Sequence, residues 1–106
     1  MIFETIISSI DNKYAVNFSP FGVRKNKKYI YISPYIPSQT LDNLIETGCA
    51  VINYVNDASL FVDCVIGNKT NLEKRKSKKI KGFFLKDSLS YEEVRVINYR
   101  EDKVRP

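Results

Sequence analysis

The sequence contains no histidine and no tryptophan, and only two cysteines and four glycines among its 106 residues. Without histidine, neither a Ser/His/Asp triad nor a Cys/His nucleophile can form within this chain. Two isolated cysteines without histidine also argue against a zinc site, and we expect no metal ligands. The glycines do not stand at the spacing of a phosphate-binding loop. The common nucleophilic and metal-dependent enzyme classes are therefore disfavoured.

Long apolar runs are also missing, since none approaches the ~20 residues that a membrane-spanning helix needs. Residues 1–10 carry an acid and no basic cluster, so we expect no signal peptide. These two features predict a cytoplasmic protein without a membrane partner. Cys49 and Cys64 lie inside apolar stretches, which predicts two buried free thiols.

What the chain has in quantity is β-forming side chains. Apolar residues make up 43 % of it, with seven tyrosines and six phenylalanines. Valine, isoleucine and aromatic residues fit a pleated, half-buried surface, so this composition favours strands. The length predicts one domain over residues 1–106.

The positive charge is concentrated in one stretch. Residues 69–81 hold seven basic residues and one acid, a net charge of +6. The other ten basic and eleven acidic residues give −1, so the rest of the chain is nearly neutral. A basic run can bind nucleic acid through phosphates, but aromatic residues for base stacking begin only at Phe83. We therefore expect a solvated basic loop over residues 68–81, and nucleic acid as an unlikely partner.

Alternating apolar residues predict strands in the first third of the chain. Residues 3–10 and 14–18 flank Asp11-Asn12, which predicts a β-hairpin. Pro20 and Gly22 then predict a break over residues 19–22. A polar turn around Asn26 and a strand over residues 29–33 follow.

Residues 38–48 show the clearest helix signal. Ser38 or Thr40 can cap its start, and Gly48 suits a left-handed residue after its end. The expected apolar stripe consists of Leu41, Leu44 and Ile45. Residues 49–55 predict a buried strand directly after this helix.

The second half of the chain is less regular. Residues 57–66 favour a helix over a strand, with Asp57 as its cap and the apolar stripe Leu60, Phe61, Cys64 and Val65. Residues 83–85 are too short to assign, residues 93–99 predict a strand, and residues 100–106 form a polar tail. Short connections between strands indicate an antiparallel sheet or barrel with helices at its edges.

The start of the helix at residues 38–48 is a candidate anion site. Free N–H groups and a partial positive charge at a helix N-terminus bind phosphate, and Ser38 and Thr40 add hydroxyls there. Such residues are more often plain caps, so this signal is weak without further support. Glu92 and Glu93 are adjacent in a strand pattern and point to opposite faces, which excludes a paired-carboxylate glycosidase site and predicts solvated or edge positions.

Three segments resemble the DUF447 family in order and spacing: residues 3–6 (FETI), 15–23 (AVNFSPFGV) and 40–53 (TLDNLIETGCAVIN). The similarity covers residues 1–67. It implies a mainly β fold, an antiparallel split β-barrel of the flavin reductase-like, FMN-binding type. It further implies a homodimer with FMN at its interface and, as the function, an FMN-binding flavoprotein, with a flavin-dependent oxidoreductase of unknown substrate as the more specific form of this expectation.

The resemblance also implies cofactor-binding positions in this sequence. Residues along the ring and ribityl chain would be Asn17, Ser19 and the backbone of Phe21, Gly22 and Val23, with Ser33, Pro34, Tyr35 and Asn53 also near the flavin. The phosphate would be bound by Ser38, Gln39 and Thr40, with Arg24 as a further candidate. From the residues alone, Asn17 is equally a polar residue of the sheet and Asn53 a satisfied amide at a strand end.

The sequence departs from the family after residue 67, where it is rich in lysine. Family members are commonly longer, so we expect a barrel shortened at the C-terminus. Two other functions remain open: a nucleic-acid-binding module that uses residues 69–81, and a structural or regulatory dimer without a ligand.

Overall fold

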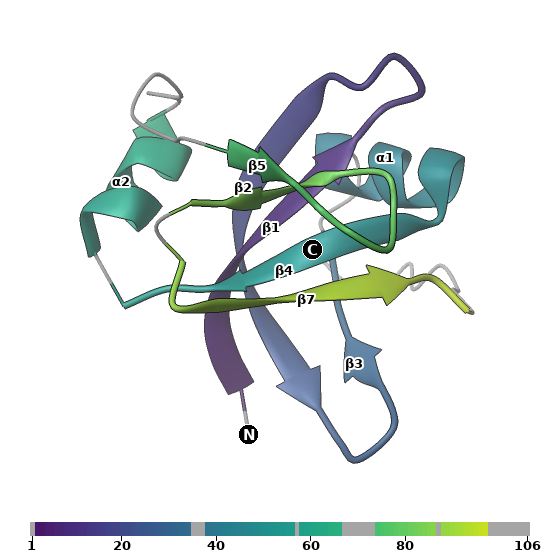
Figure 1. The fold of residues 1–106 in the computed structure, drawn as a ribbon. Helices are drawn as coiled ribbons and strands as arrows, with labels where there is room; N and C mark the ends of the chain where they lie inside the picture. Colours follow the sequence, from purple (N-terminus) through teal and green to yellow (C-terminus); the bar gives the residue numbers. More distant parts are fainter. Residues whose placement is uncertain (1, 35–37, 57, 67–73, 87, 98–106) are drawn as a thin grey trace.

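The computed structural model describes residues 2–34, 38–56, 58–66, 74–86 and 88–97. A five-stranded antiparallel sheet in the order β3-β2-β1-β4-β7 curls into the body of the molecule, and β5 and β6 form a separate two-stranded ribbon (Figure 1). The elements are β1 (Ile2–Ile10), β2 (Val16–Lys25), β3 (Ile30–Tyr31), α1 (Gln39–Thr47), β4 (Cys49–Tyr54), α2 (Ala58–Ile66), β5 (Lys74–Lys76), β6 (Phe83–Leu85) and β7 (Ser90–Arg95). The expectation of a mainly β fold is confirmed.

The predicted hairpin between β1 and β2 is confirmed, with Ile10 opposite Val16 at its turn. Asp11 Oδ1 accepts the backbone N–H of Lys13 at 2.8 Å and of Ala15 at 2.9 Å, which closes the turn. The predicted break at residues 19–22 is wrong, because β2 continues to Lys25 in unbroken register with β1. Pro20 is tolerated since β3 pairs only with the last two residues of β2, so the missing N–H interrupts no third strand.

The turn around Asn26 is confirmed, and the strand after it is shorter than expected. Asn26 Oδ1 accepts the backbone N–H groups of Lys28 and Tyr29, each at 2.8 Å. β3 then spans two residues, where the pattern predicted five. Pairing with the end of β2 alone limits its length.

Helix α1 begins and ends at the predicted caps. Ser38 Oγ accepts the N–H of Leu41 at 3.1 Å, and Gly48 adopts φ 71°. The predicted apolar stripe is partly wrong: Leu44 is buried, but Ile45 is 53 % exposed. Polar Thr40 and Asn43 are buried in its place, so the inner side of α1 is largely polar. Apolar spacing could not indicate this, because hydrogen bonds and not apolar contacts fix that side of the helix.

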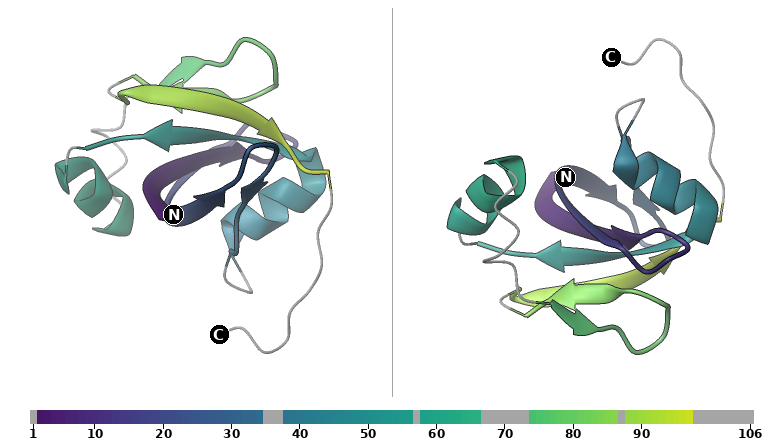
Figure 2. Two further views of the ribbon diagram at one scale, coloured as in Figure 1. Left: turned by 90° about the horizontal axis from the view of Figure 1, so that it is seen from below. Right: turned by 90° about the horizontal axis from the view of Figure 1, so that it is seen from above.

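The sheet is covered on both faces. On one face, α2 and β6 contribute Leu60, Cys64 and Leu85 to a core with Ile6 and Phe18. On the other face, Leu44 of α1 joins a second core of Ile7, Val23, Ala50 and Ile52. Figure 2 shows α1 and the β5–β6 ribbon on opposite sides of β4 and β7. The prediction that Cys49 and Cys64 are buried thiols outside any disulfide is confirmed.

The C-terminal half differs from the sequence expectation in two places. α2 confirms the helix, with Leu60 and Cys64 buried, whereas Asp57 and the side chain of Val65 lie outside the described residues. The expected basic loop instead contains β5, which pairs with β6. β7 begins earlier than predicted, because it pairs with β4 from Tyr54–Ser90 to Cys49–Arg95. Residues 67–73 and 98–106, which include the expected tail, lie outside the described residues.

Neither helix in the described part of the chain is long and apolar enough to cross a membrane.

Candidate functional site

Three of the predicted cofactor-binding residues meet at the start of α1. Asn17 Nδ2 donates to Ser19 Oγ at 3.0 Å and to Thr40 Oγ1 at 3.1 Å, and Thr40 Oγ1 donates to Ser19 Oγ at 3.1 Å. Asn17 and Ser19 are alternate residues of β2, so their side chains share the sheet face that α1 covers. The strand and the helix together therefore fix a compact polar cluster, which we call the α1 cluster (Asn17, Ser19 and Thr40).

Backbone donors remain available beside the α1 cluster. The first four N–H groups of a helix have no partner within it. Here Ser38 satisfies two of the amides at this end: its side chain accepts from Leu41 and its carbonyl from Asp42. Within the described residues, the N–H groups of Gln39 and Thr40 have no acceptor. Two free amides and the positive end of the helix dipole suit an anion at this point.

A second layer of polar contacts holds α1 in place. Gln39 Nε2 donates to Asn43 Oδ1 at 2.7 Å, and Asn43 Nδ2 donates to Ser9 Oγ of β1 at 3.0 Å. Asn43 is 1 % exposed. Gln39, a predicted phosphate ligand, is exposed, and its side-chain amide is bonded to Asn43 of the same helix. This layer fixes the position of the helix start against the sheet.

The other predicted residues of β2 divide between the two faces of the sheet. Phe21 and Val23 face the α1 side and pack in its core, where the Val23 side chain is fully buried. Gly22 and Arg24 are exposed on the opposite side of the strand. Arg24 also lies five residues from Ser19, roughly 17 Å at the usual strand rise of about 3.3 Å. Within one chain the structure does not bring Arg24 to the α1 cluster.

Ser33 and Asn53, two further predicted residues that the structure describes, form no hydrogen bond with the α1 cluster. Ser33 is exposed after β3, and Tyr35 lies outside the described residues. Asn53 is fully buried: its Nδ2 donates to the Ile6 carbonyl at 2.9 Å, and its Oδ1 accepts the N–H of Leu85 at 2.8 Å. These bonds tie β4 to β1 and β6. Of the two interpretations that the sequence left open for Asn53, a flavin contact or a satisfied amide, the second describes its surroundings in a single chain.

Acidic residues dominate the surface next to α1. An open hollow of about 600 Å³ lies between the β1–β2 turn and the helix. Its charged lining consists of Asp11, Asp42 and Glu46 against Lys13. Negative charge opposes a phosphate group there. An anion bound by α1 therefore fits the amides of Gln39 and Thr40 better than this hollow.

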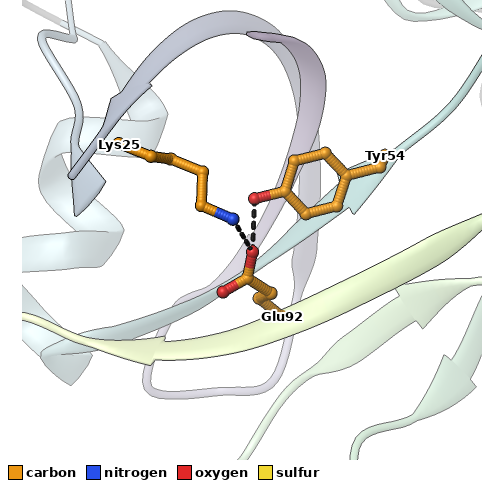
Figure 3. A network of polar contacts seen from close by, with 3 residues as sticks. All are labelled: Lys25, Tyr54 and Glu92. Carbon is orange, nitrogen blue, oxygen red and sulfur yellow. Dashed lines mark hydrogen bonds and ion pairs between the residues drawn. The ribbon is translucent and has the colours of Figure 1, made fainter. Parts of the chain in front are cut away.

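A second polar cluster, which consists of Lys25, Tyr54 and Glu92, was not predicted from the sequence. Lys25 Nζ and Tyr54 Oη both donate to Glu92 Oε1, each at 2.5 Å (Figure 3). Burial raises the pKa of Glu92, but the hydrogen bonds from Lys25 and Tyr54 outweigh it and hold the pKa below its usual value. The hydrogen bond to Glu92 raises the pKa of Lys25, and burial with the same bond raises that of Tyr54. The prediction of a solvated or edge position for Glu92 agrees with its place on β7, the edge strand of the sheet, but its bonds to Lys25 and Tyr54 were not predicted. These residues come from three strands and share no local motif.

The described residues contain no group of three or more His, Cys, Asp or Glu side chains that could hold a metal ion.

A family model described as "Protein of unknown function (DUF447) N-terminal domain" matches residues 3–106. The chain belongs to the DUF447 family. The resemblance inferred from the three sequence segments is thereby confirmed. The expected departure from the family after residue 67 is wrong, because the match extends through the lysine-rich stretch. No curated protein matches the sequence.

Solved structures agree with the family assignment. The FMN-bound DUF447 protein MM1853 from Methanosarcina mazei superposes with a TM-score of 0.76 at 24% identity, covering 93% of this chain and 53% of that one. A protein assigned as a flavin reductase with a split-barrel domain, from Shewanella frigidimarina, gives 0.84 at 18% identity, covering 97% and 59%. The 2-nitrobenzoate 2-nitroreductase NbaA from Pseudomonas fluorescens gives 0.75 at 18% identity, covering 87% and 52%.

At these identities the likeness establishes the fold. The DUF447 chain is a split barrel of the flavin reductase kind, as the sequence predicted. It spans between 52% and 59% of the lengths of these three solved structures.

Proposed function

We propose that this DUF447 chain binds FMN and serves as a flavoprotein in an oxidation–reduction reaction. The observation that carries the proposal is the α1 cluster with its two free amides, in a fold shared with a DUF447 protein described as FMN-bound. The flavin would supply the hydride or electron transfer, for which this chain needs no histidine. The chain's own residues bind and orient the cofactor.

The phosphate end of FMN fits the start of α1. The N–H groups of Gln39 and Thr40 would donate to phosphate oxygens, with the helix dipole favouring the negative charge. The Ser19 hydroxyl would donate from β2 beside them, because it accepts from Asn17 and Thr40 and keeps its own hydrogen, and Asn17 would orient it. The Thr40 hydroxyl accepts from Asn17 and donates to Ser19, so its role is to position these two side chains.

A homodimer would reconcile the positions that one chain keeps apart. Gly22 and Arg24 face away from the α1 cluster, so a single chain cannot place all the predicted residues around one flavin. If FMN lies between two copies, one copy can provide the α1 cluster and the other the outward face of β2. Light scattering with and without FMN, together with the FMN-to-chain ratio, tests this arrangement.

FMN titration, followed by flavin fluorescence, tests the phosphate site. Thr40→Val removes a hydroxyl that accepts from Asn17 and donates to Ser19, while it keeps the side-chain shape. We expect FMN affinity to fall by about tenfold, as for one or two lost hydrogen bonds. Riboflavin, which lacks the phosphate, should bind weakly to both proteins and show little difference between them.

Thr47→Val is the matched control. It removes the same group from the last turn of α1, where Thr47 Oγ1 donates to the Asn43 carbonyl at 2.8 Å. FMN affinity should stay at the wild-type value. Equal losses in both variants would indicate general loosening of α1 and contradict the phosphate site. Absence of any FMN binding or thermal stabilisation would instead favour a ligand-free dimer.

A further inference from the structure

The β5–β6 ribbon presents six exposed basic side chains in a fixed arrangement. The pairing runs from Lys74–Leu85 to Lys76–Phe83, and Leu85 is 1 % exposed in the core beneath. We call this surface the ribbon surface; its basic residues are Lys74, Arg75, Lys76, Lys78, Lys79 and Lys81.

The tip of the ribbon is held by β7. Glu93 Oε1 accepts the backbone N–H groups of Lys79 at 2.6 Å and Ile80 at 3.1 Å. Ser77 closes the turn through its N–H to the Gly82 carbonyl at 3.0 Å. The lysine side chains of the tip are therefore displayed on an ordered backbone.

The positive charge of the ribbon surface is only partly opposed within the described residues, where Glu93 interacts electrostatically with Lys79. The carboxylate of Glu93 is directed at backbone amides, and none of the six basic side chains has an ion-pair partner in the described part of the chain. Like charges held this close repel one another, so an external polyanion would relieve the repulsion.

Strand pairing brings aromatic rings among these charges. Arg75 lies directly opposite Phe84, and Phe84 stacks on Tyr91 of β7 with ring centroids 4.0 Å apart and planes at 7°. Lys74 Nζ lies 5.2 Å from the centroid of Phe83. Along the sequence the lysines precede the aromatic residues, but in the ribbon the basic strand β5 lies against β6, so Arg75 is opposite Phe84 and Lys76 is opposite Phe83. Basic and aromatic side chains are therefore neighbours in the fold, which removes the main objection to nucleic acid, the lack of aromatic residues among the lysines.

We propose that the ribbon surface binds single-stranded nucleic acid. Its phosphates would contact the lysines of the tip, and its unpaired bases would pack against Phe84 and Tyr91 beside Arg75. Paired bases of a duplex leave no ring face for such packing, so single strands should be preferred. The ribbon and α1 lie on opposite sides of β4 and β7 (Figure 2), so this activity is independent of flavin binding.

Fluorescence anisotropy with a labelled oligouridine over a range of salt concentrations tests the charge contribution. The variant K78Q/K79Q/K81Q should bind more weakly, and its slope of log affinity against log salt should fall by about two, near 0.7 per lost phosphate contact. The control K13Q/K27Q/K28Q removes the same charge from exposed lysines in other turns and should keep the wild-type slope. Equal effects of both triple variants would overturn the proposal, as would no binding at low salt.

The aromatic contribution separates nucleic acid from other polyanions. Phe84→Leu should lower oligouridine affinity by about tenfold without changing the salt slope, because it removes stacking and no charge. Binding of a heparin fragment should be unaffected by this variant. Arg75→Gln, on the exposed surface, provides a second variant that does not disturb the core. Because it removes a charge, Arg75→Gln should weaken the binding of both oligouridine and heparin. If Phe84→Leu binds oligouridine like the wild type, the surface is a general polyanion site and the proposal is wrong.

Discussion

Buried polar side chains, all satisfied, are a marked feature at the scale of single residues. Thr5, Ser8, Ser9, Asn43 and Asn53 are at most 2 % exposed. Among the described residues, no buried side-chain nitrogen or oxygen lacks a hydrogen-bond partner. An unpaired buried polar group is costly, so these bonds select one register of β1, β4 and α1 over its neighbours.

Asn53 makes this argument testable. Asn53→Leu would leave the Ile6 carbonyl and the Leu85 N–H buried without their partner. We expect the free energy of unfolding to fall by about 3 kcal/mol, from two unsatisfied groups. Urea unfolding measures it, with Asn12→Ala, an exposed turn residue, as a control that changes little. A loss below about 1 kcal/mol would show that these bonds contribute little net stability.

At the scale of elements, α1 owes its end to one backbone conformation. Gly48 has φ 71°, and a Cβ built on it would meet no atom within 4 Å. Gly48→Ala should therefore cost about 1–2 kcal/mol from conformation alone. Gly82→Ala is the matched control, because its Cβ would make ordinary contacts from 3.6 Å outward, and its cost should stay within about 0.5 kcal/mol. Thermal unfolding compares the two, and equal costs would refute the conformational explanation.

Elements with local signals could be predicted from the sequence. Asp11 and Asn26 mark turns through their own side-chain bonds, and Ser38 and Gly48 mark both ends of α1. The α1 cluster could be anticipated in part, since Thr40 lies at a helix start and the family motifs point to Asn17. Each of these signals acts within a few residues of the structure it produces.

Features that depend on distant contacts could not be predicted in this way. β5 consists of three basic residues with no strand pattern, and it forms by pairing with β6, which Leu85 anchors in the core. The sequence pattern alone predicts a solvated or edge position for Glu92, and only the curled sheet places it beside Lys25 and Tyr54. Contacts between strands that are distant in the sequence determine such positions, so no single segment of the sequence predicts them.

At the scale of the whole molecule, the Lys25–Glu92 ion pair bridges the curled sheet. β1 and β4 separate β2 from β7, so in a flat sheet the two strands would lie about 14 Å apart, three spacings of about 4.8 Å. The two side chains nevertheless meet at 2.5 Å, with Tyr54 of β4 beside them and bonded to the same carboxylate oxygen (Figure 3). Lys25 Nζ also lies 5.7 Å from the centroid of the Phe3 ring. The pair therefore links distant strands across the concave face.

The stability contributed by this link should depend on pH in a defined direction. The pKa of folded Glu92 lies below its usual value of 4.5, so the contribution is complete above that pH and disappears as the pH falls through the folded value. The pKa of folded Lys25 lies above 10.5, so the contribution is lost on the alkaline side only as the pH rises through that higher value. Both side chains are about a third exposed, so we expect about 0.5–1 kcal/mol near neutral pH, reduced by salt.

Glu92→Gln should lower the free energy of unfolding by about 0.5–1 kcal/mol near neutral pH. In acid it should cause no change, because the wild-type carboxyl is protonated there. Glu4→Gln removes the same charge from an exposed position on β1 and should leave the acid limb of the stability curve as in the wild type. Urea unfolding across the acid range measures both variants. If Glu92→Gln and the wild type keep a constant difference down to the lowest pH, the link acts through shape and not through charge. Lys25→Met should then cost the same at every pH, whereas an electrostatic link predicts that its cost also vanishes in acid.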